Sequence, residues 1–84
     1  MSIVAGEIYL LVKEIVDPSA SRPLTLESLL LEEKMMDSFG LIQLVAGIEE
    51  KFSISIDIKD LTSQNFASIN TIMMMVEGYI KEVD

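Results

Sequence analysis

The 84-residue sequence contains no cysteine and no histidine, and only six basic residues against fourteen acidic ones. Without cysteine and histidine, the chain lacks the commonest general base, the commonest metal ligand, the thiolate nucleophile and every disulfide. The formal net charge of -8 would repel a nucleic-acid backbone or an anionic membrane, whereas a basic protein surface would attract the chain. These absences exclude most small-enzyme mechanisms, and we expect no metal site and no nucleic-acid partner.

The sequence also lacks a long apolar run and a targeting signal. Its longest nearly apolar stretch, residues 69–80, is interrupted by polar residues and falls short of the roughly 20 residues that span a bilayer. Residues 1–6 contain no basic region before Glu7, so they do not form a secretory signal. We therefore expect a cytoplasmic monomer without membrane insertion. A chain of this length forms one core, which predicts a single domain over residues 1–84, and the Met1 start favours a discrete protein.

Apolar residues recur at helical spacing near both ends of the chain. The stripe of the first segment consists of Val4, Ile8, Leu11 and Ile15, with Val12 at its edge. Asp17-Pro18 is expected to end this helix, because the residue before a proline avoids helical backbone angles. The last helix should begin after Ser68 as its N-cap. Its buried stripe consists of Ile69, Ile72, Met73, Val76 and Ile80, and Met74 points away from it.

A third helix is predicted in the middle of the chain, opening at Asp37 or Ser38 and running to Phe52. Its core stripe consists of Leu41, Leu44, Val45, Ile48 and Phe52. Its opposite face carries Phe39, Ile42, Gln43, Ala46, Glu49 and Glu50. Two bulky apolar side chains therefore lie where a surface helix usually has polar ones, which favours a face that docks on partners. The alternative is that Phe39 folds back under the preceding loop and covers Leu29 or Met36.

The segments between these helices are irregular. Residues 17–37 show no period, and a loop of this length is usually functional or fastened to the core. Several of its apolar residues are expected to pack on the core, with one helical turn near residues 26–31; the candidates are Leu24, Leu26, Leu29, Leu30, Met35 and Met36. Residues 58–63 are predicted to form a short helix after a turn. The predicted fold is all-α, a small four-helix bundle of three main helices plus a short third helix.

Asp37 and Ser38, at the start of the middle helix, form the candidate chemical centre. Either residue could simply be the N-cap, which satisfies a free backbone N–H. The acidic neighbour, the exposed Phe39 and the open loop instead favour Ser38 as the carrier of a phosphodiester, which the positive end of the helix dipole would stabilise. Ser38 is not expected to be a catalytic nucleophile, because no histidine and no nearby lysine could activate its hydroxyl.

The run Asp37-Ser38-Phe39, followed by Leu44-Val45, Ile48-Glu49-Glu50 and Phe52, resembles the acyl carrier protein family, and the match covers most of the chain. The resemblance implies that a phosphopantetheinyl transferase moves 4′-phosphopantetheine from coenzyme A onto Ser38, with Asp37 assisting the modification. The thiol of that arm would hold an acyl or aminoacyl thioester. The resemblance also implies that the acidic second helix docks on basic partner surfaces through Glu49 and Glu50.

Departures from the family pattern bear on the type of carrier. Phe39 stands where the family usually has leucine, and Gly40 and Gln43 occupy positions that are commonly acidic in fatty-acid carriers. These residues and segment 65–69 are closer to D-alanyl, aminoacyl or polyketide carriers. We therefore predict a non-enzymatic carrier that shuttles its cargo between a loading enzyme and downstream acyl-accepting enzymes of a biosynthetic pathway.

Two other functions remain open. An unmodified helical adaptor would use the same exposed face, which consists of Phe39, Ile42, Ala46, Glu49 and Glu50, and Ser38 would only cap its helix. A small enzyme is disfavoured, because the sequence offers no base, nucleophile pair or metal cluster. The presence or absence of the phosphopantetheine arm separates the carrier from the adaptor.

Overall fold

The computed structural model describes residues 3–16 and 23–82, and their regular structure is entirely helical. The elements are the α-helices α1 (Ile3–Ile15), α2 (Ser38–Phe52) and α3 (Ile69–Glu82), and the 3-10 helix η1 (Ile58–Asp60). The all-α prediction is therefore confirmed, and α2 begins and ends as predicted. Among the described residues, no helix combines the length and the apolar character that crossing a membrane requires.

The predicted four-helix count is not confirmed, because the segment predicted as a short helix over residues 58–63 contains only the single turn η1. Its start is fixed by Asp57, whose side chain accepts a hydrogen bond from the Lys59 N–H at 3.0 Å. Its end is set by Leu61, whose backbone angles (φ -82°, ψ 71°) leave the helical region. The Thr62 hydroxyl then accepts from the Asn65 N–H at 3.1 Å, which turns the chain toward α3 instead of continuing a helix.

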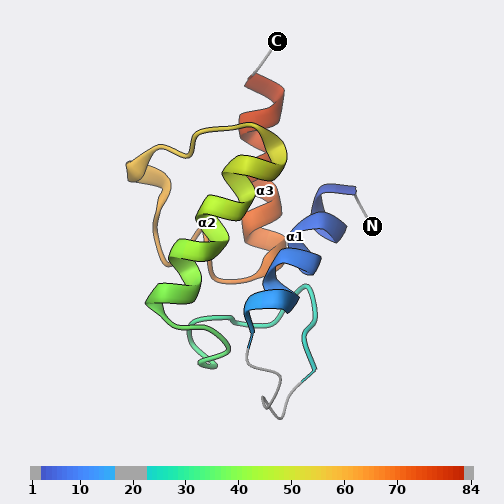
Figure 1. Cartoon of the computed structure of the whole chain (residues 1–84), viewed down its shortest axis with the longest axis vertical. Helices are drawn as coiled ribbons and strands as arrows, with labels where there is room; N and C mark the ends of the chain where they lie inside the picture. Colours follow the sequence, from blue (N-terminus) through green and yellow to red (C-terminus); the bar gives the residue numbers. More distant parts are fainter. Residues whose placement is uncertain (1–2, 17–22, 83–84) are drawn as a thin grey trace.

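Helix α1 is the element that contacts both other α-helices. In Figure 1, α2 crosses in front of α3, α1 lies beside them, and the connection after α2 runs along the side of α2 opposite to α1. The fully buried residues of α1 are Ala5, Ile8 and Val12. Val12 is therefore central to the buried stripe and not at its edge as predicted, since α1 packs against two neighbours. The predicted end at Asp17-Pro18 lies outside the described residues, and α1 ends at Ile15.

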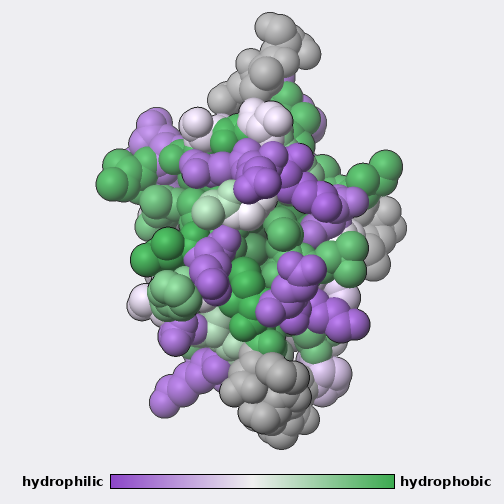
Figure 2. All heavy atoms as spheres, in the orientation of Figure 1, coloured by the Kyte–Doolittle hydropathy of each residue, from purple (hydrophilic) through white to green (hydrophobic). Residues whose placement is uncertain are grey.

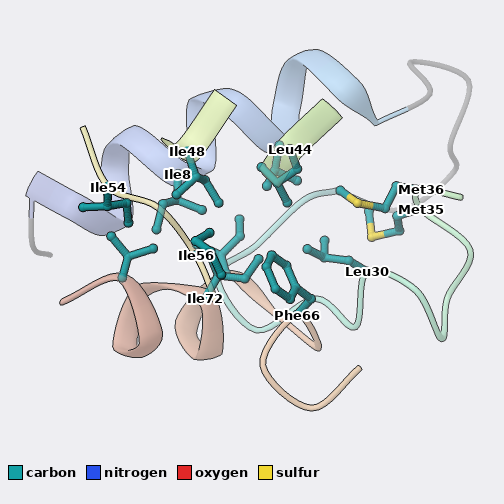
Figure 3. Close-up of a cluster of buried hydrophobic side chains, with 13 residues drawn as sticks. Ile8, Leu30, Met35, Met36, Leu44, Ile48, Ile54, Ile56, Phe66 and Ile72 are labelled. Atoms are coloured by element: carbon teal, nitrogen blue, oxygen red, sulfur yellow. The ribbon is translucent and has the colours of Figure 1, made fainter. Parts of the chain in front are cut away.

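The core gathers side chains from all three α-helices and from both connections (Figure 3). The long loop contributes Leu30, Met35 and Met36, which are buried, so its predicted packing on the core is confirmed. Leu29 does not join them, because 39% of it is exposed. The helical turn predicted near residues 26–31 lies slightly later and does not extend into a helix: the Glu33 N–H donates to the Leu29 carbonyl at 2.8 Å. The Leu30 N–H also donates to the carbonyl of Ala67 at 2.9 Å, which ties the loop to the chain before α3.

Helix α3 begins as the sequence predicts and ends differently. The Ser68 hydroxyl accepts a hydrogen bond from the Thr71 N–H at 3.3 Å, which confirms the predicted N-cap. Ile72 is fully buried and Met74 is 67% exposed, again as predicted. Ile80 was expected in the buried stripe but is 38% exposed. The reason is visible in Figure 1, where the C-terminal end of α3 extends past the other helices.

Candidate functional site

The start of α2 separates the two candidate residues by role. Asp37 is the N-cap, with extended backbone angles (φ -103°, ψ -173°). Its Oδ1 accepts a hydrogen bond from the Gly40 N–H at 2.8 Å. Ser38 is the first helical residue and is exposed. The capping interpretation of Ser38 is therefore wrong, because Asp37 satisfies the free N–H that a capping serine would satisfy.

The electrostatics of this helix start favour an anion on Ser38. The first backbone N–H groups of a helix have no partner within the helix, and the helix dipole places partial positive charge there. The first turn of α2 contains no acidic residue, and the carboxylate beside it is that of the cap Asp37, which already accepts the Gly40 N–H. A phosphodiester on the Ser38 hydroxyl would thus lie at a favourable place.

Two glycines explain how closely α2 packs on its neighbours. A Cβ atom at Gly40 would lie 2.9 Å from Ile15 Cγ2 and 3.3 Å from Met36 Cβ. About two turns later on the same face, a Cβ at Gly47 would lie 3.3 Å from Leu11 Cδ2. The absence of side chains lets the first turn of α2 sit directly on α1 and on the long loop. Close packing therefore explains why position 40 is a glycine, whatever the type of cargo.

The outward face of α2 is exposed and partly apolar. Phe39 is 68% exposed and Ile42 is 67% exposed, while Gln43, Ala46 and Glu50 are also exposed. Phe39 therefore does not fold under the preceding loop. Figure 2 shows apolar surface interleaved with polar side chains over α2 and the connection that follows it. The prediction of an exposed, partly apolar face is confirmed as a matter of geometry, and its use as a docking surface stays a prediction.

The predicted docking residues border different hollows of the surface. Ile42, Ala46 and Glu49 line a groove of about 320 Å³ that we call the α2 groove. Its other lining residues are Leu41, Val45, Leu61 and Phe66. Phe39 lines a separate depression of about 520 Å³ together with Asp37, Gly40, Gln43 and residues of α1 and the long loop. Glu50 lines neither of these hollows.

Ser38 lies on the side of α2 that carries the groove. At about 100° per residue, Ser38 is roughly 40° from Ile42 and roughly 20° from Val45 around the helix axis. Both of those residues line the α2 groove. A flexible group attached to the Ser38 hydroxyl can therefore run along this mainly apolar groove. The arrangement suits a covalently attached chain with an apolar end.

Glu49 has a structural partner that the sequence did not indicate. Its Oε2 accepts a hydrogen bond from the Ile56 N–H at 2.8 Å. This contact is possible because α2 ends at Phe52 and the C-cap Ser53, with a positive φ of 55°, redirects the chain. Glu49 therefore holds the connection after α2, and only Glu50 of the two is a freely exposed acid.

Other residues of the groove were also missed by the sequence analysis. Leu61 and Phe66 come from the connection after α2 and form the wall opposite Ile42. Phe66 could have been recognised as the only aromatic residue in the largely polar segment 57–68. Among the described residues, no group of three or more acidic side chains is arranged to hold a metal ion.

Comparison with known proteins assigns the family. No protein-family model matches the chain. Over 57 residues, the chain is 33% identical to the protein named "Acyl carrier protein" of Buchnera aphidicola subsp. Baizongia pistaciae (strain Bp), and the match covers 68% of this chain and 70% of that protein. The chain therefore belongs to the acyl carrier protein family. Membership favours a carrier function over a catalytic one.

Proposed function

We propose that this protein is an acyl carrier whose Ser38 receives a 4′-phosphopantetheine arm and whose arm carries an acyl or aminoacyl thioester. The observation that supports the proposal most strongly is the exposed Ser38 at the first position of α2, with Asp37 as the cap, in a member of the acyl carrier protein family. The serine is thus accessible, lies at the positive end of a helix, and has no structural duty as a cap.

The modification would be a phosphoryl transfer. The Ser38 oxygen forms a bond to the phosphorus that bears the pantetheine chain in coenzyme A, and the bond from that phosphorus to the 3′,5′-ADP leaving group breaks. The hydroxyl proton passes to a base of the phosphopantetheinyl transferase. One carboxylate oxygen of Asp37 holds the Gly40 N–H, and the other would face the transferase and assist the magnesium that the reaction uses.

The cargo would be attached to the thiol at the end of the arm. This supplies the reactive sulfur that a sequence without cysteine lacks. The α2 groove gives an apolar part of the cargo a place beside the arm. The exposed residues Phe39, Ile42, Ala46 and Glu50 would contact the loading enzyme and the accepting enzymes, and the acidic surface would speed encounter with basic partners. Glu49 would contribute to docking as well, although its side chain already accepts a hydrogen bond from the Ile56 N–H.

The type of cargo is a further part of the proposal. Gln43 and segment 65–69 favour an aminoacyl or specialised acyl group over ordinary fatty-acid elongation. Gly40 is not evidence for this subtype, because close packing explains the glycine. Loading assays with the modified protein test this. Adenylating enzymes for amino or aryl acids from the same host should load it better than fatty-acid enzymes, and the opposite preference would contradict the subtype.

Intact mass spectrometry tests the central proposal. The purified chain, incubated with coenzyme A, Mg²⁺ and a promiscuous phosphopantetheinyl transferase, should gain the mass of one arm. Ser38→Ala should gain nothing while keeping its helical circular dichroism, because the cap is Asp37. Ser63→Ala is the matched control at another exposed serine and should be modified normally. An unmodified wild-type chain would favour the helical adaptor, and a modified Ser38→Ala chain would refute the assignment of Ser38.

A further inference from the structure

Tyr79 of α3 joins the two ends of the turn η1 through one hydroxyl group. Its oxygen accepts a hydrogen bond from the Asp57 N–H at 2.8 Å. The same hydroxyl donates its proton to the carboxylate of Asp60. Asp57 precedes η1 and Asp60 ends it, so a single side chain of α3 holds the whole turn in place.

The turn η1 in turn determines the position of Leu61. Leu61 follows Asp60 directly, and its N–H donates to the carbonyl of Ile58 at 3.1 Å. Leu61 is 43% exposed, whereas Phe66, the other groove residue of this connection, is 1% exposed and fixed by the core. The place of Phe66 is therefore set by packing, while that of Leu61 depends on the hydrogen bonds that hold η1.

Tyr79 does not itself line the α2 groove. The major helix contacts are those of α1 with α2 and with α3, and the connection after α2 runs from α2 to α3 (Figure 1). This connection carries the groove residue Leu61 and the partners of Tyr79. The Asn65 side-chain N–H donates to the carbonyl of Asp60 at 2.8 Å and strengthens the same segment from within. A change at Tyr79 would therefore reach the groove through η1 and Leu61.

We infer that Tyr79 is a positioning residue for the α2 groove: by holding Asp57 and Asp60, it keeps Leu61 opposite Ile42 and so sets the width of the groove. Without the Tyr79 hydroxyl, η1 moves away from α3 more often and the Leu61 wall opens. The part of this inference that concerns cargo rests on the proposed function, since it requires an acyl chain on an arm at Ser38. The part that concerns η1 does not.

The first test uses the unmodified protein and compares Tyr79→Phe with Tyr9→Phe. Both variants keep the ring and lose one hydroxyl, but Tyr9 lies on α1. In Tyr79→Phe, amide hydrogen exchange of Asp57 should accelerate about fivefold, the factor expected for one hydrogen bond, and the nuclear Overhauser contacts between Leu61 and Ile42 should weaken. Tyr9→Phe should change neither. Unchanged exchange and unchanged contacts in Tyr79→Phe would overturn the inference.

The second test uses the modified protein carrying a medium-chain acyl thioester. Cleavage of the thioester by hydroxylamine should be several-fold faster in Tyr79→Phe than in wild type or Tyr9→Phe, because an open groove shelters the chain less. Asp60→Asn, which keeps a hydrogen-bond acceptor, should restore most of the protection that Asp60→Ala loses. Faster amide exchange with unchanged cleavage would overturn the role in the groove. If no variant accepts the arm, the proposed function fails, and the exchange experiment still decides whether Tyr79 holds η1.

Discussion

The two connections that flank α2 are fastened in different ways. Before α2, residues 23–37 are held by backbone hydrogen bonds, such as the Met35 N–H to the Leu30 carbonyl at 2.8 Å, and by buried apolar side chains. After α2, residues 53–68 likewise have backbone hydrogen bonds and buried side chains, those of Ile54, Ile56 and Phe66. In addition, side chains of both neighbouring helices hold this second connection. Glu49 holds Ile56 from α2, and Tyr79 holds Asp57 from α3.

This difference gives the two connections different properties. The connection before α2 can move only if the core rearranges, so it holds the start of α2 and Ser38 in a fixed position. In the second connection, the stretch between the buried residues Ile56 and Phe66 is held to α3 by a single side chain, that of Tyr79, so the position of this stretch can be adjusted while the core stays intact. The fixed connection adjoins the depression near Phe39, and the adjustable one forms the wall of the α2 groove.

The largest expected effect comes from breaking the first connection. Leu30→Ala removes a fully buried side chain and should lower the free energy of unfolding by about 2–5 kcal/mol. Urea denaturation followed by circular dichroism measures this. Leu29→Ala, at the partly exposed neighbour, should cost clearly less. Equal losses in the two variants would show that the loop is not anchored through Leu30.

The next effect concerns the contact between the first connection and α2. Gly40→Ala brings a methyl group against Ile15 and Met36 and should lower the free energy of unfolding by about 1–3 kcal/mol. Gly78→Ala on α3 is the matched control, because its added Cβ would meet nothing within 4 Å. That change should stabilise the protein by up to about 1 kcal/mol. Thermal melts measure both variants. Melting temperatures that are both above or both below that of wild type would contradict the close packing at Gly40.

A smaller effect is expected when the second connection loses its bond to α2. Glu49→Ala removes the acceptor for the Ile56 N–H and should lower the free energy of unfolding by about 1–2 kcal/mol. Glu50→Ala, at an exposed neighbour, should stay within about 0.5 kcal/mol of wild type. Chemical denaturation of the pair separates a structural acid from a solvent-exposed one, and matching values would refute the structural role of Glu49.

The smallest expected effect is a change in the titration of Tyr79, which tests how the second connection is held without disrupting the fold. The hydrogen bond to Asp60, followed by burial, raises the pKa of Tyr79. In Tyr9→Phe, where Tyr79 is the remaining tyrosine, phenolate absorbance should rise at a pH above the usual tyrosine value of about 10. The contribution of this hydrogen bond to the stability of the fold is fully present below the usual tyrosine pKa and is lost as the pH rises through the raised pKa of Tyr79. Asp60→Ala should lower the midpoint, and an unchanged midpoint would show that this bond is not formed in solution.

The sequence predicted the features that depend on local patterns. The apolar spacing of residues 38–52 was sufficient to give the bounds of α2 and the exposure of Phe39 and Ile42. The polar character of Ser68 at the edge of an apolar stripe was sufficient to give the cap of α3. Such patterns report which side of a helix is buried, because burial and helical periodicity act on neighbouring residues.

The features that the sequence did not predict depend on distant partners. The bond from Ile56 to Glu49 joins residues 7 positions apart, and the bond from Asp57 to Tyr79 joins residues 22 positions apart. Neither spacing leaves a periodic signal. The exposure of Ile80 likewise depends on where the other helices end in space (Figure 1), which the residues around it do not record.

The cap of α2 and the serine proposed for modification are two different residues, Asp37 and Ser38, and this separation matters for how stable the helix stays when Ser38 is modified. If the serine were the cap, every chemical change at its hydroxyl would also remove the hydrogen bond that begins α2. Because that bond belongs to Asp37, the arm that we propose on Ser38 could be attached and hydrolysed away again while the helix keeps its first turn. The same folded molecule would then survive repeated rounds of attachment and removal without having to refold between them.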